Sequence, residues 1–95
     1  MDINELIKNP ATTLLDVRTP EECAAGIIEG AVTIPLNELP FRLDEVKNLN
    51  TPIVCYCRSG ARSAQATMWL NQQGIEAYNG GGISDVYFVK INAHV

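Results

Sequence analysis

The sequence is poor in the residues that build metal centres and disulfide frameworks. Its 95 residues include three cysteines and a single histidine, His94, close to the chain end. A small, odd number of cysteines does not favour a disulfide-stabilised fold, and no cysteine pair or histidine cluster has the spacing of a metal site. We therefore expect neither a metal ion nor any other cofactor.

Positive charge and long apolar runs are also scarce. Seven basic residues face eleven acidic ones, and the resulting net charge of −4 argues against a sequence-independent nucleic-acid binder. No apolar run approaches the roughly 20 residues that a membrane-spanning helix needs. Residues 1–8 lack the basic and then apolar pattern of a secretory signal. These features predict a cytoplasmic protein that binds neither nucleic acid nor a membrane.

The remaining composition is that of a globular chain. Apolar residues make up 46% and charged residues 19%, which is enough apolar material for a hydrophobic core. The length suffices for one core but not for two. Because no repeat or linker is visible either, we expect a single domain over residues 1–95.

One segment combines the features of a reactive site. A short apolar run from Ile53 to Tyr56 stops at Cys57, and small and cationic residues then lead into a helical pattern over 62–73. This pattern predicts a strand, a tight loop and a helix. Backbone N–H groups in such a loop and the helix N-terminus favour a thiolate over a thiol. Cys57 is therefore the candidate nucleophile, surrounded by Arg58, Ser59, Gly60, Ala61, Arg62 and Ser63.

Strand and helix patterns alternate along the whole chain. Strands are predicted over 12–17, 31–34, 52–56 and 75–78, and helices over 3–8, 19–25, 36–47, 62–73 and 83–89. Asp2 and Thr19 are expected to cap the first two helices, with Pro20 at the first helical position. Short connections between alternating elements predict an α/β fold with a mainly parallel sheet, in which 52–56 is a central strand.

Three finer expectations concern local structure. Asn37 is expected to cap the helix over 36–47, with Pro40 in its first turn. Glycines 80–82 are expected to form a turn before the last helix. On the helix over 62–73, Met68 is expected to face inward with the small residues, and Trp69 to lie on the polar side.

Several of these segments together resemble the rhodanese (thiosulfate sulfurtransferase-like) domains. In order, they are Leu14-Leu15-Asp16-Val17-Arg18, Pro20-Glu21-Glu22, Gly30-Ala31, Ile34-Pro35, the loop from Cys57 to Ser63, and Gly81-Gly82-Ile83. The resemblance implies a three-layer fold around a parallel sheet of four to five strands. It implies that Cys57 carries a persulfide cradled by the backbone amides of 58–63. It also implies that Asp16 and Arg18 support this loop from the neighbouring strand end.

The chain departs from the family pattern at two positions. Many members have Gly-His-Ile where this chain has Gly26-Ile27-Ile28, and a tryptophan where it has Val86. Neither change removes the nucleophile. The missing histidine leaves a different wall beside the site, so the substrate preference stays open.

The implied activity is transfer of a sulfane sulfur from an anionic donor such as thiosulfate to cyanide or a thiol. A sulfur-relay module that serves a partner protein needs the same persulfide and is the alternative. Arg58 and Arg62 can attract an anionic donor, although Arg62 can equally brace the loop. Asp16 and Arg18 can form a purely structural ion pair. Ser63 is a loop and capping residue that can also place its hydroxyl near the sulfur.

A phosphatase or arsenate reductase is the competing enzyme class, since it also holds a cysteine in an anion-binding loop. Loops of the tyrosine-phosphatase type place five residues between cysteine and arginine, usually with a histidine before the cysteine. Here four residues separate Cys57 from Arg62, and Tyr56 precedes the cysteine. The smaller ring suits a sulfur atom better than a tetrahedral phosphate.

The other two cysteines are interpreted as packing residues. Cys55 lies two positions before Cys57 on the predicted strand, where a small apolar side chain fits the core. A role as a resolving thiol is the alternative, which the strand geometry disfavours. Cys23 has no local activating feature.

Overall fold

The computed structural model describes residues 2–92, which form an α/β fold with a four-stranded sheet. Strands β1 (Thr13–Asp16), β2 (Val32–Thr33), β3 (Ile53–Cys57) and β4 (Ala77–Gly82) lie in the order β2-β1-β3-β4, and every neighbouring pair is parallel. The predicted fold class is confirmed. His94 lies outside the described residues.

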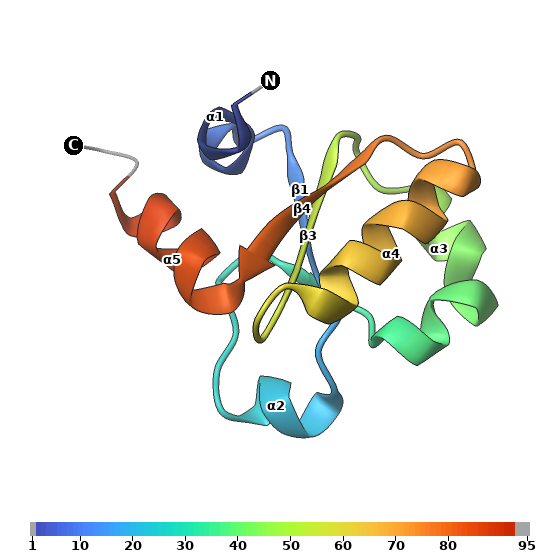
Figure 1. Ribbon diagram of the computed structural model, residues 1–95, viewed down its shortest axis with the longest axis horizontal. Coiled ribbons are helices and arrows are strands. Elements are labelled where there is room, and N and C mark those ends of the chain that lie inside the picture. The colour runs from blue at the N-terminus through green and yellow to red at the C-terminus, as the bar shows by residue number, and fades with distance from the viewer. Residues whose placement is uncertain (1, 93–95) are drawn as a thin grey trace.

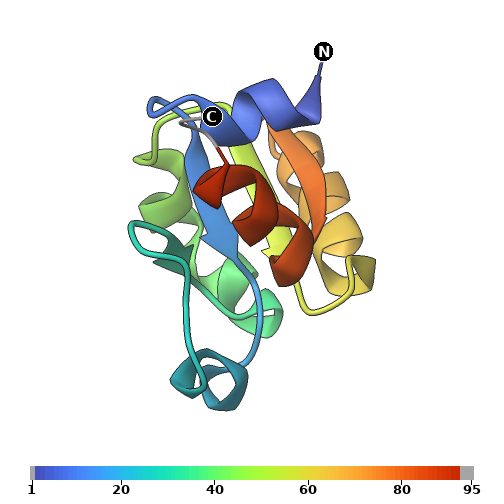
Figure 2. The same ribbon diagram turned by 90° about the vertical axis from the view of Figure 1, so that its left-hand side faces the viewer.

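Helices cover both faces of this sheet (Figure 1). Helices α1 (Ile3–Lys8) and α5 (Ile83–Ile91) pack on one face, and Figure 2 shows α5 in front of the strands. The 3-10 helix η1 (Leu36–Arg42), α3 (Leu43–Lys47) and α4 (Ala61–Gln72) pack on the other. The short helix α2 (Pro20–Ala24) lies beyond the end of β1. Within residues 2–92 no helix has the length and apolar character needed to cross a bilayer.

Strand β3 is the centre of the fold, as its apolar sequence predicts. All five of its side chains are buried, and they alternate between the two cores. Ile53, Cys55 and Cys57 point toward α4, whereas Val54 and Tyr56 point toward α1 and α5. Each fully buried aliphatic side chain stabilises the fold by roughly 1.5–3 kcal/mol. This packing fixes the carboxyl end of β3, where Cys57 lies.

The first two helix starts agree with the sequence. Asp2 accepts a hydrogen bond from the backbone N–H of Asn4, 2.9 Å away. Thr19 caps α2 and forms a reciprocal capping box with Glu22, and Pro20 occupies the first helical position. Two of the exposed N–H groups at the start of α2 are thereby satisfied.

The single helix predicted over 36–47 is wrong. The chain forms the 3-10 helix η1 and then the α-helix α3, and Asn37 does not act as a cap because Pro35 holds that position. Pro40 cannot donate the backbone hydrogen bond that an α-helix requires there, so the segment takes the tighter winding. Leu39 is still buried in the core.

The turn predicted at the glycine run is also wrong, because β4 continues through all three glycines. A side chain at Gly80 would meet Val54 Cγ1 at 2.8 Å, and one at Gly82 would meet the carbonyl oxygen of Arg58 at 2.6 Å. The glycines therefore let β4 approach the loop after β3, and only Gly81 has a positive φ, at 91°.

Helix α4 differs from the sequence prediction in which side chains face inward. Its buried residues are Ser63, Ala66 and Leu70, whereas Met68 is 63% exposed. Trp69, expected on the polar side, is partly buried against the core beneath α4. The buried stripe follows a spacing of three and four residues and is narrower than the composition suggested.

Candidate active site

The loop after β3 wraps around the sulfur of Cys57. The chain reverses between Cys57 and Ala61, where α4 begins, and Gly60 supports the reversal with a φ of 103°. The backbone N–H of Gly60 donates to Cys57 Sγ at 3.0 Å, and that of Ser63 donates at 3.4 Å. The Ser63 hydroxyl oxygen lies 3.4 Å from the same sulfur. The arrangement is therefore an amide-lined cradle for one sulfur atom.

The cradle favours the thiolate. Burial on its own raises the pKa of Cys57, but hydrogen bonds to the sulfur, including those from the backbone N–H groups of Ser63, Gly60 and Ser59, together lower this pKa to about 7. An ordinary cysteine has a pKa near ~8.5. A substantial fraction of Cys57 is therefore ionised at neutral pH, as a nucleophilic cysteine requires.

The remaining loop residues form the rim. Arg58, Ser59 and Ala61 are exposed to solvent. The Arg58 carbonyl packs against Gly82 of β4. Among residues 2–92, Arg58 forms no ion pair within 4.0 Å. It is therefore the rim cation available to an anionic molecule that approaches Cys57.

Arg62 forms an ion pair with a glutamate from a different part of the chain. Its guanidinium donates to both carboxylate oxygens of Glu22 on α2, at 2.6 and 2.9 Å. This pair lowers the pKa of Glu22 to about 2. Of the two roles that the sequence left open for Arg62, the geometry matches that of a brace, since both ends of the guanidinium fork are occupied.

Asp16 and Arg18 form a buried ion pair at the end of β1. Arg18 donates to both Asp16 carboxylate oxygens at 2.8–3.0 Å, and the hydrogen bond to Asp16 raises the pKa of Arg18. The guanidinium also donates to the carbonyl oxygens of Gly26, at 2.8 Å, and Glu22, at 3.4 Å. The pair thus fixes α2 and the segment after it, and α2 in turn holds Arg62.

Besides Glu22, the structure adds a second residue that sequence reasoning missed. Asn79 on β4 accepts hydrogen bonds from the Ser63 hydroxyl, at 2.7 Å, and from the backbone N–H of Gly81, at 3.0 Å. Its Nδ2 donates to the carbonyl oxygen of Gly60 at 3.1 Å. The available signal was a polar residue directly before a glycine run.

The other two cysteines lack such a cradle. Cys55 is fully buried in the core beneath α4, and burial raises its pKa to about 11. Cys23 is partly exposed on α2, and burial together with the nearby Asp16 carboxylate raises its pKa. Neither thiol is activated at neutral pH.

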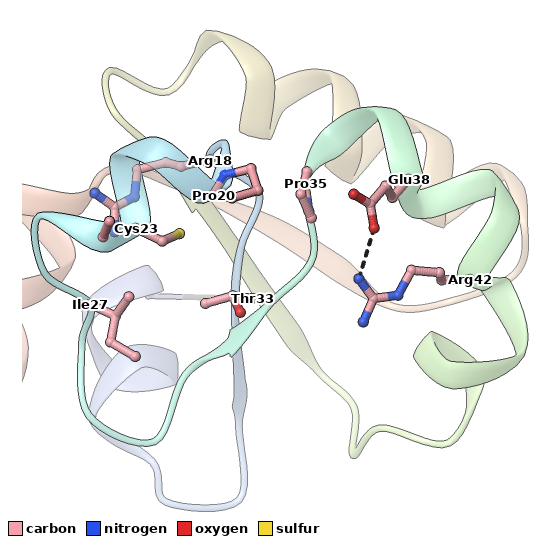
Figure 3. Close-up of a pocket in the computed structure, with 9 residues that line it drawn as sticks. Arg18, Pro20, Cys23, Ile27, Thr33, Pro35, Glu38 and Arg42 are labelled. Carbon is pink, nitrogen blue, oxygen red and sulfur yellow. Dashed lines mark hydrogen bonds and ion pairs between the residues drawn. The ribbon is translucent and has the colours of Figure 1, made fainter.

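Two hollows adjoin the segment that follows α2, whose Gly26 carbonyl oxygen is bound by Arg18. Figure 3 shows the larger one, of about 500 Å³, with Cys23 from α2, Ile27 and Thr33 around it. The smaller one, of about 310 Å³, lies between Ile27 and Tyr87 of α5. Cys57 lines neither hollow. Ile27 lines both and is 53% exposed, so the position at which many family members carry histidine is an apolar wall here.

Comparison with known proteins agrees with the fold. The family model of the rhodanese-like domain matches residues 2–89. The chain belongs to the rhodanese-like domain family, as the sequence resemblance predicted.

Its relatives include proteins named as sulfurtransferases. The chain is 48% identical to a sulfurtransferase of Allochromatium vinosum over 61 residues, which are 64% of this chain and 56% of that protein. It is 34% identical to the thiosulfate sulfurtransferase PspE of Escherichia coli, over 81% of this chain and 76% of that protein. The crystal structure of a rhodanese-related protein from Thermoplasma volcanium superposes with a TM-score of 0.75 at 34% identity, covering 92% and 85% of the two chains.

Proposed function

We propose that the protein is a sulfurtransferase in which Cys57 accepts a sulfane sulfur and passes it to a thiophilic acceptor. The observation that carries this proposal is the cradle itself, in which the N–H groups of Gly60 and Ser63 point at the Cys57 sulfur from 3.0 and 3.4 Å. Membership of the rhodanese-like domain family and the relatives named as sulfurtransferases support it.

With thiosulfate as donor, the Cys57 thiolate attacks the outer sulfur. The sulfur–sulfur bond of thiosulfate breaks, sulfite leaves with the electron pair, and the enzyme holds a cysteine persulfide. A second nucleophile, cyanide or a thiolate, then attacks the outer persulfide sulfur and releases the Cys57 thiolate. This is ping-pong nucleophilic catalysis, and it needs no general base because a substantial fraction of the attacking thiol is already ionised at neutral pH.

The residues in and around the loop have different roles in this proposal. The inward N–H groups stabilise the charge on sulfur in both the thiolate and the persulfide. Arg58 on the rim attracts the anionic donor, whereas Arg62, held by Glu22, keeps α4 in place beside the loop. Asp16 and Arg18 support the loop indirectly, because Arg18 holds α2 and therefore positions Glu22.

The size of the ring favours sulfur over phosphate. Four residues separate Cys57 from Arg62, and three hydrogen-bonding groups already lie within 3.4 Å of Cys57 Sγ. A tetrahedral phosphate would need a wider ring and an arginine fork free to hold two oxygens. The fork formed by the two terminal nitrogens of Arg62 is already taken, because Nη1 and Nη2 each donate to Glu22.

A single-turnover assay tests the proposal. On mixing the protein with excess thiosulfate and no acceptor, we expect one sulfite per chain, and added cyanide should then give sustained thiocyanate formation. Cys57→Ser should release no sulfite, while the matched variant Cys55→Ser should release as much as the wild type. Sulfite release by Cys57→Ser, or hydrolysis of a phosphate monoester at a comparable rate, would overturn the proposal.

A protein acceptor is the second candidate for the sulfur. The observation that favours it is the apolar surface next to the segment that follows α2. There, Ile27 and Tyr87 are each 53% exposed around the smaller hollow. A small anion such as cyanide gains nothing from such a surface. A relay module should pass its sulfur faster to a protein thiol than to cyanide, whereas a free-standing enzyme should show the reverse order.

A further inference from the structure

The hydroxyl of Ser63 has one proton and several acceptors within reach. The Asn79 Oδ1 lies 2.7 Å from the Ser63 oxygen, the Gly60 carbonyl oxygen lies at 3.1 Å and the Gly81 carbonyl oxygen at 3.4 Å. Cys57 Sγ lies 3.4 Å away. A hydroxyl donates a single hydrogen bond, so the shortest contact, that to Asn79, takes the proton.

The orientation of the Asn79 amide is fixed by its own neighbours. The backbone N–H of Gly81 needs an acceptor and lies 3.0 Å from Oδ1, while the carbonyl oxygen of Gly60 needs a donor and lies 3.1 Å from Nδ2. Exchanging the amide oxygen and nitrogen would break both bonds. The atom that Asn79 offers to Ser63 is therefore an oxygen, and Ser63 must be the donor.

The direction of the Ser63 proton determines how Ser63 can interact with the Cys57 sulfur. With its proton directed at Asn79, the Ser63 oxygen presents a lone pair to the sulfur, and such an oxygen accepts a hydrogen bond from a thiol but cannot donate one to a thiolate. We propose that Asn79 is a positioning residue that holds the Ser63 proton away from Cys57, so that Ser63 assists the ionised sulfur only after its hydroxyl has turned. This inference rests on the proposed role of Cys57 as the nucleophile.

Removing the Asn79 oxygen should release the proton. The remaining acceptors would be two neutral carbonyl oxygens and the thiolate, and a charged acceptor forms the stronger hydrogen bond. Replacing Asn79 with leucine, which has a similar branched shape, should therefore lower the pKa of Cys57 by about half to one unit. The Asn79 side chain is exposed on an edge strand, so we expect the variant to fold.

Charged groups around the loop come from every element packed against it. They are Arg58, Arg62, Glu22 of α2, Asp16 at the end of β1, Arg18 after β1, and Asp85 of α5, which accepts from the Gly82 N–H at 3.2 Å. On β3 itself, burial raises the pKa of Cys55 and Tyr56, which stay neutral at pH values near 7. Among residues 2–92 none of these charged side chains hydrogen-bonds to Asn79. Their influence is therefore the same before and after its replacement.

The test is a double-mutant cycle on the thiol itself. The pKa of Cys57 is measured from the pH dependence of its alkylation by iodoacetamide, followed on the Cys57 peptide by mass spectrometry. We expect Asn79→Leu to lower the pKa when Ser63 is present and to leave it unchanged in a Ser63→Ala background. Ser63→Ala alone should move the pKa little, because Ser63 does not donate to the thiolate in the resting protein.

Two results would overturn the proposal. One is an unchanged pKa in Asn79→Leu together with a pKa raised by about one unit in Ser63→Ala, which means that Ser63 already donates to the thiolate. The other is a shift in Asn79→Leu that persists without Ser63. Asn79→Ala serves the same cycle if the leucine variant does not fold. Because alkylation needs no sulfur donor, these outcomes are independent of whether the protein transfers sulfur.

Discussion

Arg62 and Glu22, forty residues apart in sequence, form a two-point ion pair with N–O distances of 2.6 and 2.9 Å. The pair joins the start of α4 to α2 beside the Cys57 loop. It also offsets the positive charge of Arg62, for which the sequence left substrate binding and bracing of the loop equally open. Several expected outcomes depend on this relationship.

Freeing Arg62 should strengthen the binding of an anionic donor. Glu22→Gln keeps a side chain that can complete the capping box with Thr19 but removes the negative charge. We expect the KM for thiosulfate to fall about two- to fivefold, which corresponds to roughly 0.5–1 kcal/mol for a charge near the surface. Steady-state kinetics at low salt measures this. An unchanged KM at all salt concentrations would show that the Arg62 charge does not reach the donor.

The same pair should contribute to stability above acidic pH. In the folded protein Glu22 has a pKa of about 2, against 4.5 for an ordinary glutamate, so between these values the unfolded chain binds more protons. The stabilisation is complete above about pH 4.5 and is lost as the pH falls toward about 2. The free energy of unfolding, measured with urea, should therefore fall more steeply with decreasing pH for the wild type than for Glu22→Gln. Parallel stability curves for the two proteins would contradict the pair's contribution.

The Cys57 cradle should be visible in the pH dependence of its reactivity. Because the pKa of Cys57 is lowered to about 7, the rate of alkylation should rise with pH and reach half its maximum near pH 7. An unperturbed thiol would do so near ~8.5. Cys23 on the same chain is the internal control, since its pKa is raised and its alkylation should begin at higher pH. Coincident profiles for the two cysteines would mean that the loop does not activate Cys57.

Two glycines offer a matched test of the loop geometry. Gly60 and Gly74 both have a positive φ, 103° and 80°, so an alanine at either position should cost about 1–2 kcal/mol of stability. A Cβ at Gly60 would lie 3.2 Å from Gly81 Cα, whereas one at Gly74 would meet nothing within 4 Å.

Only the Gly60 change should affect catalysis. Gly60→Ala moves the N–H that donates to Cys57 Sγ, and the loss of one such donor should reduce sulfur transfer by about tenfold or more. Gly74→Ala should keep the wild-type rate despite a similar loss of stability. Equal activities for the two variants would mean that the Gly60 N–H does not contribute to catalysis.

The strand, loop and helix around Cys57 were easier to predict from the sequence than the contacts that hold them in place. The apolar run into Cys57, the small residues of the loop and the helix after them are local signals, and they place the candidate nucleophile at the end of β3. The Arg62–Glu22 pair and the contact of Asn79 with Ser63 are long-range, so no local pattern reveals them. The glycine run was misread as a turn because glycine permits both a turn and a close approach of strands, and only the neighbouring Arg58 carbonyl decides between them.

The central claim is that Cys57 carries the transferred sulfur as a persulfide. Intact-mass measurement of the chain after treatment with thiosulfate, without an acceptor or reductant, tests it most directly. We expect the wild type to gain the mass of one sulfur atom, to lose it on addition of cyanide, and Cys57→Ser to gain nothing. A gain of the same mass by Cys57→Ser, or no gain by the wild type with thiosulfate or any other sulfane donor, would contradict the account.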